Sequence, residues 1–245
     1  FFHLVIETAK GTNGNFQTYG GSETMNYGIG LGYYKEEGIL KGTGYNRIDF
    51  NTNMQVTPVK NALVDARINL STGTRKRGTP SQVSSLQSAP QIETIPGDPM
   101  QLSSLYPGGD SPVWEEVRRK LEGTEEKNRS FRIRSNLKLS YRFLEDFEIS
   151  SSGSLDYSLE RRNFFSPSYL DASGKGRNKS LGEQGINMMA LNENLLTYRK
   201  NWGDHNLSIL AGQSFQFDQN DYNGGYAMNT PSELVWYAST AFPQY

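Results

Sequence analysis

The sequence predicts an all-β fold: an antiparallel up-and-down sheet that forms a segment of a transmembrane β-barrel, with about eight strands and long extracellular loops. Two observations predict it. Apolar and polar residues alternate over long segments, and the connections between these segments are in turn short and long. Since successive side chains of a strand point to opposite sides, each such segment has one apolar and one polar face.

The first group of strands is expected between about residues 15 and 71. After a short strand at Phe16–Tyr19, the next strand sets its apolar side chains opposite Asn26 and three glycines. Two further strands repeat the alternation. The apolar faces of these three strands consist of Met25, Tyr27, Ile29, Leu31 and Tyr33, then Ile48, Phe50, Met54 and Val56, then Ala62, Val64, Ala66, Ile68 and Leu70.

The second group of strands is expected between about residues 130 and 217. Its first strand, Phe131–Phe143, has the clearest alternation in the chain, and Phe147–Leu159 follows with the same pattern. The strand near Ala190–Trp202 is less cleanly patterned. The last strand has Leu207, Ile209, Ala211, Phe215 and Phe217 on its apolar face.

The connections differ in length in a regular way. Long polar loops are expected at residues 72–129, 160–189 and 218–245, and the first contains six prolines and a predicted short helix at Val113–Leu121. Tight turns are expected at Gly20–Glu23, Thr57–Asn61, Leu144–Asp146 and Gly203–His205. All tight turns then fall at one end of the sheet, as in outer-membrane barrels with short periplasmic turns and long extracellular loops.

The composition excludes several classes of protein. The net charge of −1 gives no support for nucleic-acid binding, and the absence of cysteine excludes disulfides and thiolate chemistry. The sequence contains no run of 18 apolar residues, so no transmembrane helix is predicted. The mean hydropathy of −0.65 still permits a barrel, because half of each strand faces water.

Several segments together resemble the SusC/RagA family of TonB-dependent transporters. They cover roughly residues 15–71 and 130–217, and comprise Gly20–Tyr27, Gly32–Tyr34, Glu37–Gly42, Gly44–Phe50, Glu193–Tyr198 and His205–Ser214. The resemblance implies import of oligosaccharides or peptides across the outer membrane of a Gram-negative Bacteroidota bacterium. It also implies TonB as the energy source, a SusD-like surface lipoprotein as partner, and outer-membrane lipid around the barrel.

Members of that family are much longer, with an N-terminal plug and a barrel of about 22 strands. No plug or TonB-contacting segment is recognisable here, and the chain opens on Phe1-Phe2-His3-Leu4 without a signal peptide. We therefore expect residues 1–245 to be an internal part of one transporter barrel. Two alternatives remain: a small self-contained structural or adhesive barrel, and a soluble carbohydrate-binding β-sandwich.

Four basic side chains share the polar face of the clearest strand: Arg132, Arg134, Lys138 and Arg142. They would project into the lumen. One interpretation is an electropositive wall that attracts an anionic substrate or packs on an acidic plug surface. The other, which we favour, is that they pair with Glu148 or Asp156 on the neighbouring strand.

Aromatic residues of the expected extracellular loops, Tyr106, Trp114, Trp236 and Tyr237, could contact substrate or the partner lipoprotein, or anchor their own loops. The helix Val113–Leu121 could dock the lipoprotein, although its apolar stripe is expected to pack on its own loop.

No catalytic, metal or cofactor site is predicted. Asp218, Asn220 and Asp221 only faintly resemble a calcium loop, because Tyr222 stands where a ligand is needed. His3 and His205 have no partner at zinc-binding spacing.

Overall fold

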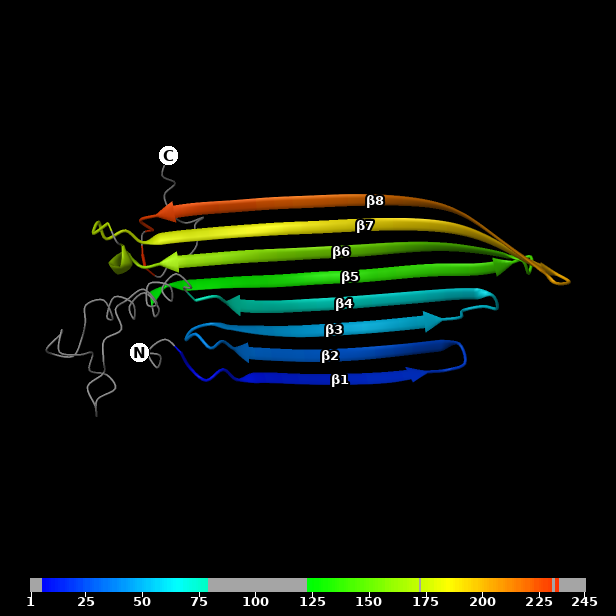
Figure 1. The fold of residues 1–245 in the computed structure, drawn as a ribbon, viewed down its shortest axis with the longest axis horizontal. Coiled ribbons are helices and arrows are strands. Elements are labelled where there is room, and N and C mark those ends of the chain that lie inside the picture. The colour runs from blue at the N-terminus through cyan, green and yellow to red at the C-terminus, as the bar shows by residue number, and fades with distance from the viewer. Residues whose placement is uncertain (1–5, 79–122, 172, 231, 234–245) are drawn as a thin grey trace.

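The computed structural model describes residues 6–78, 123–171, 173–230 and 232–233. They form one eight-stranded sheet in which each strand pairs antiparallel with the next along the chain (Figure 1). The strands are β1 (Gly11–Gly21), β2 (Met25–Glu37), β3 (Gly44–Val56), β4 (Ala62–Lys76), β5 (Glu125–Phe143), β6 (Phe147–Ser166), β7 (Lys179–Trp202) and β8 (His205–Met228). A 3-10 helix, η1 (Ser168–Leu170), follows β6. No helix in the described part of the chain is long and apolar enough to cross a membrane.

The connections are sorted by length between the two ends of the sheet, as predicted (Figure 1). At one end the strands are joined by residues 22–24, 57–61, 144–146 and 203–204. At the other end they are joined by residues 38–43, 77–124 and 167–178. The all-β, up-and-down, eight-strand prediction is confirmed.

The expected bounds of the long loops were wrong, because the strands continue beyond the apolar region at the long-loop end of the sheet. The loop expected at 160–189 is only 167–178, β8 continues to Met228 instead of ending near 217, and β4 and β5 narrow the loop 72–129 to 77–124. In these extensions both faces of the sheet carry polar side chains, such as Arg161 and Arg162. Alternation is then lost from the sequence, although the backbone ladder continues.

The strand register separates an apolar from a polar face of the sheet, with few exceptions. One transverse row on the outer face consists of Phe16, Leu31, Phe50, Leu70, Ile133, Tyr157, Met188 and Gln219. The adjacent row, on the inner face, consists of Gln17, Gly30, Asn51, Asn69, Arg134, Asp156, Met189 and Asp218. The outer face is therefore mostly apolar and the inner face mostly polar.

The outer face is largely exposed in the part of the chain that the structure describes. Among the described residues, the buried hydrophobic side chains are only Phe165 and Ala227. By contrast, Phe16 is 62% exposed and Ile48 is 54% exposed. An apolar surface of this extent is unusual on a water-soluble monomer and indicates a surface covered by something apolar.

Aromatic rings mark the short-turn end of that surface. Phe143 lies 5.5 Å from Phe147, and Phe147 lies 4.7 Å from Tyr198, centroid to centroid. Along β5, Tyr141 at this end and Phe131 toward the other lie on the same face. Strand residues rise about 3.3 Å each, so at a tilt of about 40° this stretch covers about 25 Å, the height of the apolar band of a membrane barrel.

Three amides interrupt the apolar face near its middle, Asn192 and Asn194 on β7 and Gln213 on β8. Hydrogen bonds satisfy part of the polarity of the two on β7. The Nδ2 of Asn194 donates to Oδ1 of Asn192 at 2.7 Å, and Nδ2 of Asn192 donates to the carbonyl of Ser152 at 3.1 Å. Such internal pairing is what a low-dielectric surrounding demands.

The sheet has β1 and β8 at its edges. A single sheet contradicts the soluble-sandwich alternative, because a sandwich requires two sheets face to face. The sheet order also gives no ladder between β1 and β8, so the described residues do not support the small self-contained barrel.

Candidate functional site: the inner wall

The inner wall has two chemically different halves. On β1 to β3 its side chains are chiefly amides and tyrosines: Asn13, Asn15, Gln17, Tyr19, Tyr34, Tyr45, Asn51, Asn53 and Gln55. On β4 to β7 it carries most of the charge, arranged in ion pairs. Because alternation directs all these side chains to one side of the sheet, both halves face the same space.

Asp156 on β6 holds two of the predicted basic residues. The Arg132 guanidinium donates to it through Nε at 2.9 Å and Nη2 at 2.6 Å. Arg134, its direct partner in the ladder, lies 3.5 Å away through Nε. Two cations thus share one carboxylate across the β5–β6 ladder.

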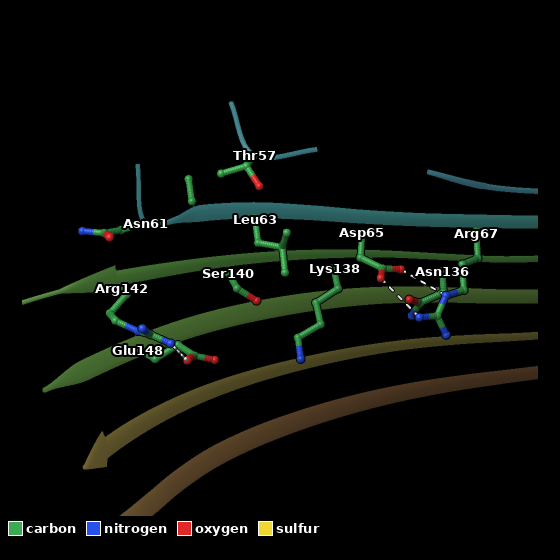
Figure 2. Close-up of a pocket in the computed structure, with 11 residues that line it drawn as sticks. Thr57, Asn61, Leu63, Asp65, Arg67, Asn136, Lys138, Ser140, Arg142 and Glu148 are labelled. Carbon is green, nitrogen blue, oxygen red and sulfur yellow. Dashed lines mark hydrogen bonds and ion pairs between the residues drawn. The ribbon is translucent and has the colours of Figure 1, made fainter. Parts of the chain in front are cut away.

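Glu148 on β6 makes a second arrangement of the same kind. It lies 3.6 Å from Nη2 of Arg142 and 3.5 Å from Nη1 of Arg199. Three of the four predicted basic residues therefore pair with Asp156 or Glu148, as the pairing interpretation expects. The fourth, Lys138, has no ion pair with any described residue (Figure 2). That this face lines a lumen stays a prediction.

Toward the long-loop end, Arg162 on β6 bridges two carboxylates. Its Nε donates to Glu126 at 2.8 Å and its Nη1 donates to Glu183 at 3.2 Å. The Tyr222 hydroxyl also donates to Glu183. That hydrogen bond is the main cause of the lowered pKa of Glu183 and of the raised pKa of Tyr222.

A hollow of about 680 Å³ opens at this end of the inner wall. Tyr45 and Arg75 line it from one side, and Arg162, Glu183 and Tyr222 from the other. The Arg75 guanidinium lies over the Tyr45 ring, 5.3 Å from its centroid. We name this the upper hollow. It offers both charge signs, hydrogen-bond donors and acceptors, and two aromatic rings to a solute.

Glycines on β2 let side chains of the neighbouring strands lie flat on the wall. A Cβ at Gly28 would meet Oδ1 of Asn53 at 2.6 Å and Cδ1 of Tyr19 at 2.8 Å. A Cβ at Gly30 would meet Oδ1 of Asn51 at 2.5 Å. The Tyr19 ring therefore covers Gly28 with one face, while the residue is 72% exposed.

Side-chain hydrogen bonds of Asp171 and Asn178 stabilise the loop between β6 and β7. The Asp171 carboxylate accepts hydrogen bonds from the Ser173 hydroxyl at 2.8 Å and from the Arg177 backbone at 3.1 Å. These contacts, the Ser173 hydroxyl first, hold the pKa of Asp171 well below its usual range. The buried Asn178 side chain accepts from the Thr230 N–H at 2.7 Å and donates to its carbonyl at 3.3 Å.

Other predicted residues lie elsewhere. Tyr106, Trp114, Trp236, Tyr237 and the helix at 113–121 fall outside the described residues, so their contacts stay predictions. β8 places Asp218 and Asp221 on opposite faces of a strand, which is incompatible with the loop a calcium site needs. No group of three His, Cys, Asp or Glu side chains in the described ranges is placed to hold a metal.

The residues of the upper hollow were not foreseen as a group. Tyr45 and Arg75 come from β3 and β4, whereas Glu183 and Tyr222 come from segments expected to be loops. Only the register of the extended strands brings them to the same end of the wall. The Gly28 and Gly30 alternation was visible in the sequence, but not the side chains that lie over it.

The chain is similar to two curated proteins of Formosa agariphila. It is 25% identical to TonB-dependent receptor P26 over 228 residues, which is 88% of this chain and 22% of the relative. It is 24% identical to TonB-dependent receptor P3, over 89% of this chain and 22% of the relative. No family model matches the chain.

Solved structures of the RagAB peptide importer share the fold. The importer in its closed-closed state aligns with a TM-score of 0.74 and 13% identity, over 99% of this chain and 28% of that chain. The RagAB peptide transporter gives the same values. The chain thus spans 22% of these curated relatives and 28% of these solved chains. Together these findings confirm the resemblance to a segment of a SusC/RagA-type TonB-dependent transporter.

Proposed function

We propose that this chain forms part of the barrel wall of a TonB-dependent importer in the outer membrane of a Gram-negative Bacteroidota bacterium. In this proposal the apolar outer face contacts outer-membrane lipid and the inner wall lines the path of a nutrient. The chain supplies binding surface and selectivity, and it catalyses no reaction.

The observation that carries the proposal is the exposed apolar face, bounded by aromatic rings and backed by a charged and amide-rich wall. Water-soluble proteins bury such a face against another layer of secondary structure. A bilayer provides that cover instead, and its thickness fits the strand length between the aromatic rings. The two free edges would pair with further strands, because open edges are not tolerated in lipid.

The upper hollow is the proposed place of contact with the nutrient. Its arginines and carboxylates suit the opposite charges of a peptide, and the fold shared with the RagAB peptide importer favours this class. The amide and tyrosine side chains of β1 to β3 would equally suit an oligosaccharide, since sugar hydroxyls bind amides and sugar rings stack on aromatic faces. Both substrate classes are therefore tested.

The proposed partners act at opposite ends of the wall. A SusD-like surface lipoprotein would cover the long-loop end, where the clamped loop 167–178 and the predicted contacts Tyr106, Trp114, Trp236 and Tyr237 would meet it. TonB would act from the periplasm through parts of the protein outside this chain. No nucleic acid is involved.

Uptake by whole cells tests the proposal. Cells with the intact gene, cells lacking it, and cells carrying Arg75→Ala with Tyr222→Ala are given radiolabelled hexapeptides or radiolabelled oligosaccharides. We expect the deletion to abolish uptake of one class and the double variant to reduce it more than fivefold at equal protein amount in the outer membrane. Uptake of both classes that is unchanged by the deletion would refute the proposal.

A further inference from the structure

A second hollow lies at the short-turn end of the inner wall. Its volume is about 570 Å³, and it extends from the β3–β4 turn to β6. The charged residues that line it are Asp65, Arg67, Lys138, Arg142 and Glu148 (Figure 2). We name it the lower hollow. It shares no lining residue with the upper hollow.

Lys138 stands in this hollow without a carboxylate partner among the described residues. Figure 2 shows it between two ion pairs, Asp65 with Arg67 on one side and Glu148 with Arg142 on the other. It lies directly opposite Asp65 in the β4–β5 ladder, so a carboxylate is within reach of its strand position. Nevertheless its ammonium group forms no ion pair with any described residue.

Arginines already contact both carboxylates, Asp65 through a two-point fork and Glu148 through two single contacts to its Oε2. Arg67 contacts both oxygens of Asp65, Oδ1 through Nε at 3.1 Å and Oδ2 through Nη2 at 3.2 Å. Glu148 is shared between Arg142 and Arg199. A planar guanidinium satisfies a carboxylate in two places, whereas an ammonium group is a single point charge, so Lys138 does not displace Arg67 from Asp65.

The hollow therefore carries excess positive charge. Three cations, Arg67, Lys138 and Arg142, face two carboxylates, and Arg199 adds a fourth cation beside Glu148. The Ser140 hydroxyl and the Asn61 amide also line the hollow and can donate hydrogen bonds. A charged group in a concave wall with an apolar reverse side is poorly screened, and it attracts an anion strongly.

We propose that the lower hollow is a binding site for a carboxylate, with Lys138 as its charged anchor. The carboxylate comes either from an acidic side chain elsewhere in the protein or from the nutrient as it leaves the wall. The two sources share one chemistry, and the experiment separates them. The proposal rests on the proposed function only in taking this face as the lumen.

The rate of lysine acylation in the intact protein, purified in detergent, tests the site. Acetyl N-hydroxysuccinimide is the reagent, and mass spectrometry reads Lys138 against Lys60, which lies in the adjacent β3–β4 turn. With an internal carboxylate, we expect Lys138 to react more than tenfold more slowly than Lys60 in low salt. The gap should narrow at least threefold in 1 M NaCl, because salt screens the pair.

With a nutrient as the source, Lys138 should react as fast as Lys60. Hexaglutamate at millimolar concentration should then slow Lys138 alone more than threefold, and hexaserine should not. Two results would overturn the site. One is equal acylation rates of Lys138 and Lys60 that hexaglutamate leaves unchanged. The other is slow acylation of Lys138 that 1 M NaCl leaves unchanged, since this indicates that Lys138 is covered without being paired to a charge. The acylation assay does not depend on nutrient uptake. Its failure can therefore be distinguished from failure of the proposed function.

Discussion

Removing the charge of Asp156 should weaken the β5–β6 ladder in a way that removing a comparable carboxylate elsewhere does not. Asp156→Asn keeps the size and shape of the side chain but leaves Arg132 and Arg134 without their shared counter-charge. Arg132 now donates to Asp156 through two hydrogen bonds of 2.9 and 2.6 Å that span neighbouring strands. The amide of the variant offers one acceptor oxygen and no charge, so one of these bonds is lost and the other weakened.

The magnitude follows from geometry and exposure. A hydrogen bond to a charged group contributes about 1.5–3 kcal/mol when it is buried, and an exposed ion pair contributes about 0.2–1 kcal/mol. The side chains of Arg132 and Asp156 are 46% and 26% exposed, between these limits. We therefore expect a loss of about 1–2 kcal/mol in the free energy of unfolding, smaller in high salt.

Reversible urea unfolding of the intact protein in detergent micelles, followed by tryptophan fluorescence, measures this loss. Asp49→Asn is the matched control, because Asp49 pairs at 2.7 Å with Arg47 on its own strand and ties no two strands together. The control should change the free energy of unfolding by less than about 0.5 kcal/mol. An equal or larger loss in Asp49→Asn would refute the reasoning.

Three further changes test other parts of the structure. Gly28→Ala should destabilise the protein by about 1 kcal/mol in the same urea assay, since the new Cβ meets two side chains below 3.0 Å, whereas Gly153→Ala, with nothing within 4 Å, should not; equal effects would contradict the glycine argument. Leu144→Asn with Glu145→Gly should stabilise it by about 1–2 kcal/mol, because both residues have positive φ, 50° and 58°; a loss of stability would contradict this. The pKa of Asp171 is lowered in the folded protein. The ionised carboxylate therefore stabilises the fold at any pH above the usual pKa of an aspartate, and this contribution is lost only as the pH falls toward the lower pKa of the folded state. Amide exchange in the 167–178 loop, corrected for intrinsic rates, should thus stay slow down to about pH 4 and be fast in Asp171→Asn at pH 7; exchange that accelerates already near pH 6 would contradict it.

The sequence was most informative where one face of a strand meets an apolar surrounding. Within Phe131–Phe143 the apolar side chains must point to the apolar face and the charged ones to the other face, so alternation alone predicted the strand and its two faces. The turns at 57–61 and 144–146 were equally clear, because short turns interrupt an otherwise continuous alternation. Which carboxylates would hold Arg132 and Arg142 also followed from neighbouring strands with opposite charges.

Where the strands extend beyond the apolar band, the sequence carried little information. Around Arg161 and Arg162 both faces are polar, so no period distinguishes strand from loop. The upper hollow lies in this region, and its members come from strands separated by more than a hundred residues of sequence, as Tyr45 and Tyr222 show. That Lys138 has no ion pair with a described residue depends on which carboxylates the arginines occupy, and those contacts form only in the folded protein.

A cysteine-accessibility scan across both faces of the sheet measures whether lipid covers the apolar face. Residues 1–245 contain no cysteine, so label found in peptides of this segment reports the substituted position. Phe50→Cys and Leu155→Cys lie on the outer face, and their chain neighbours Asn51→Cys and Ser154→Cys lie on the inner face. In outer-membrane vesicles treated with a charged maleimide, we expect the two inner-face cysteines to be labelled and the two outer-face cysteines to stay unlabelled. Equal labelling of both pairs, or labelling of the outer pair alone, would contradict the claim that lipid covers the apolar face.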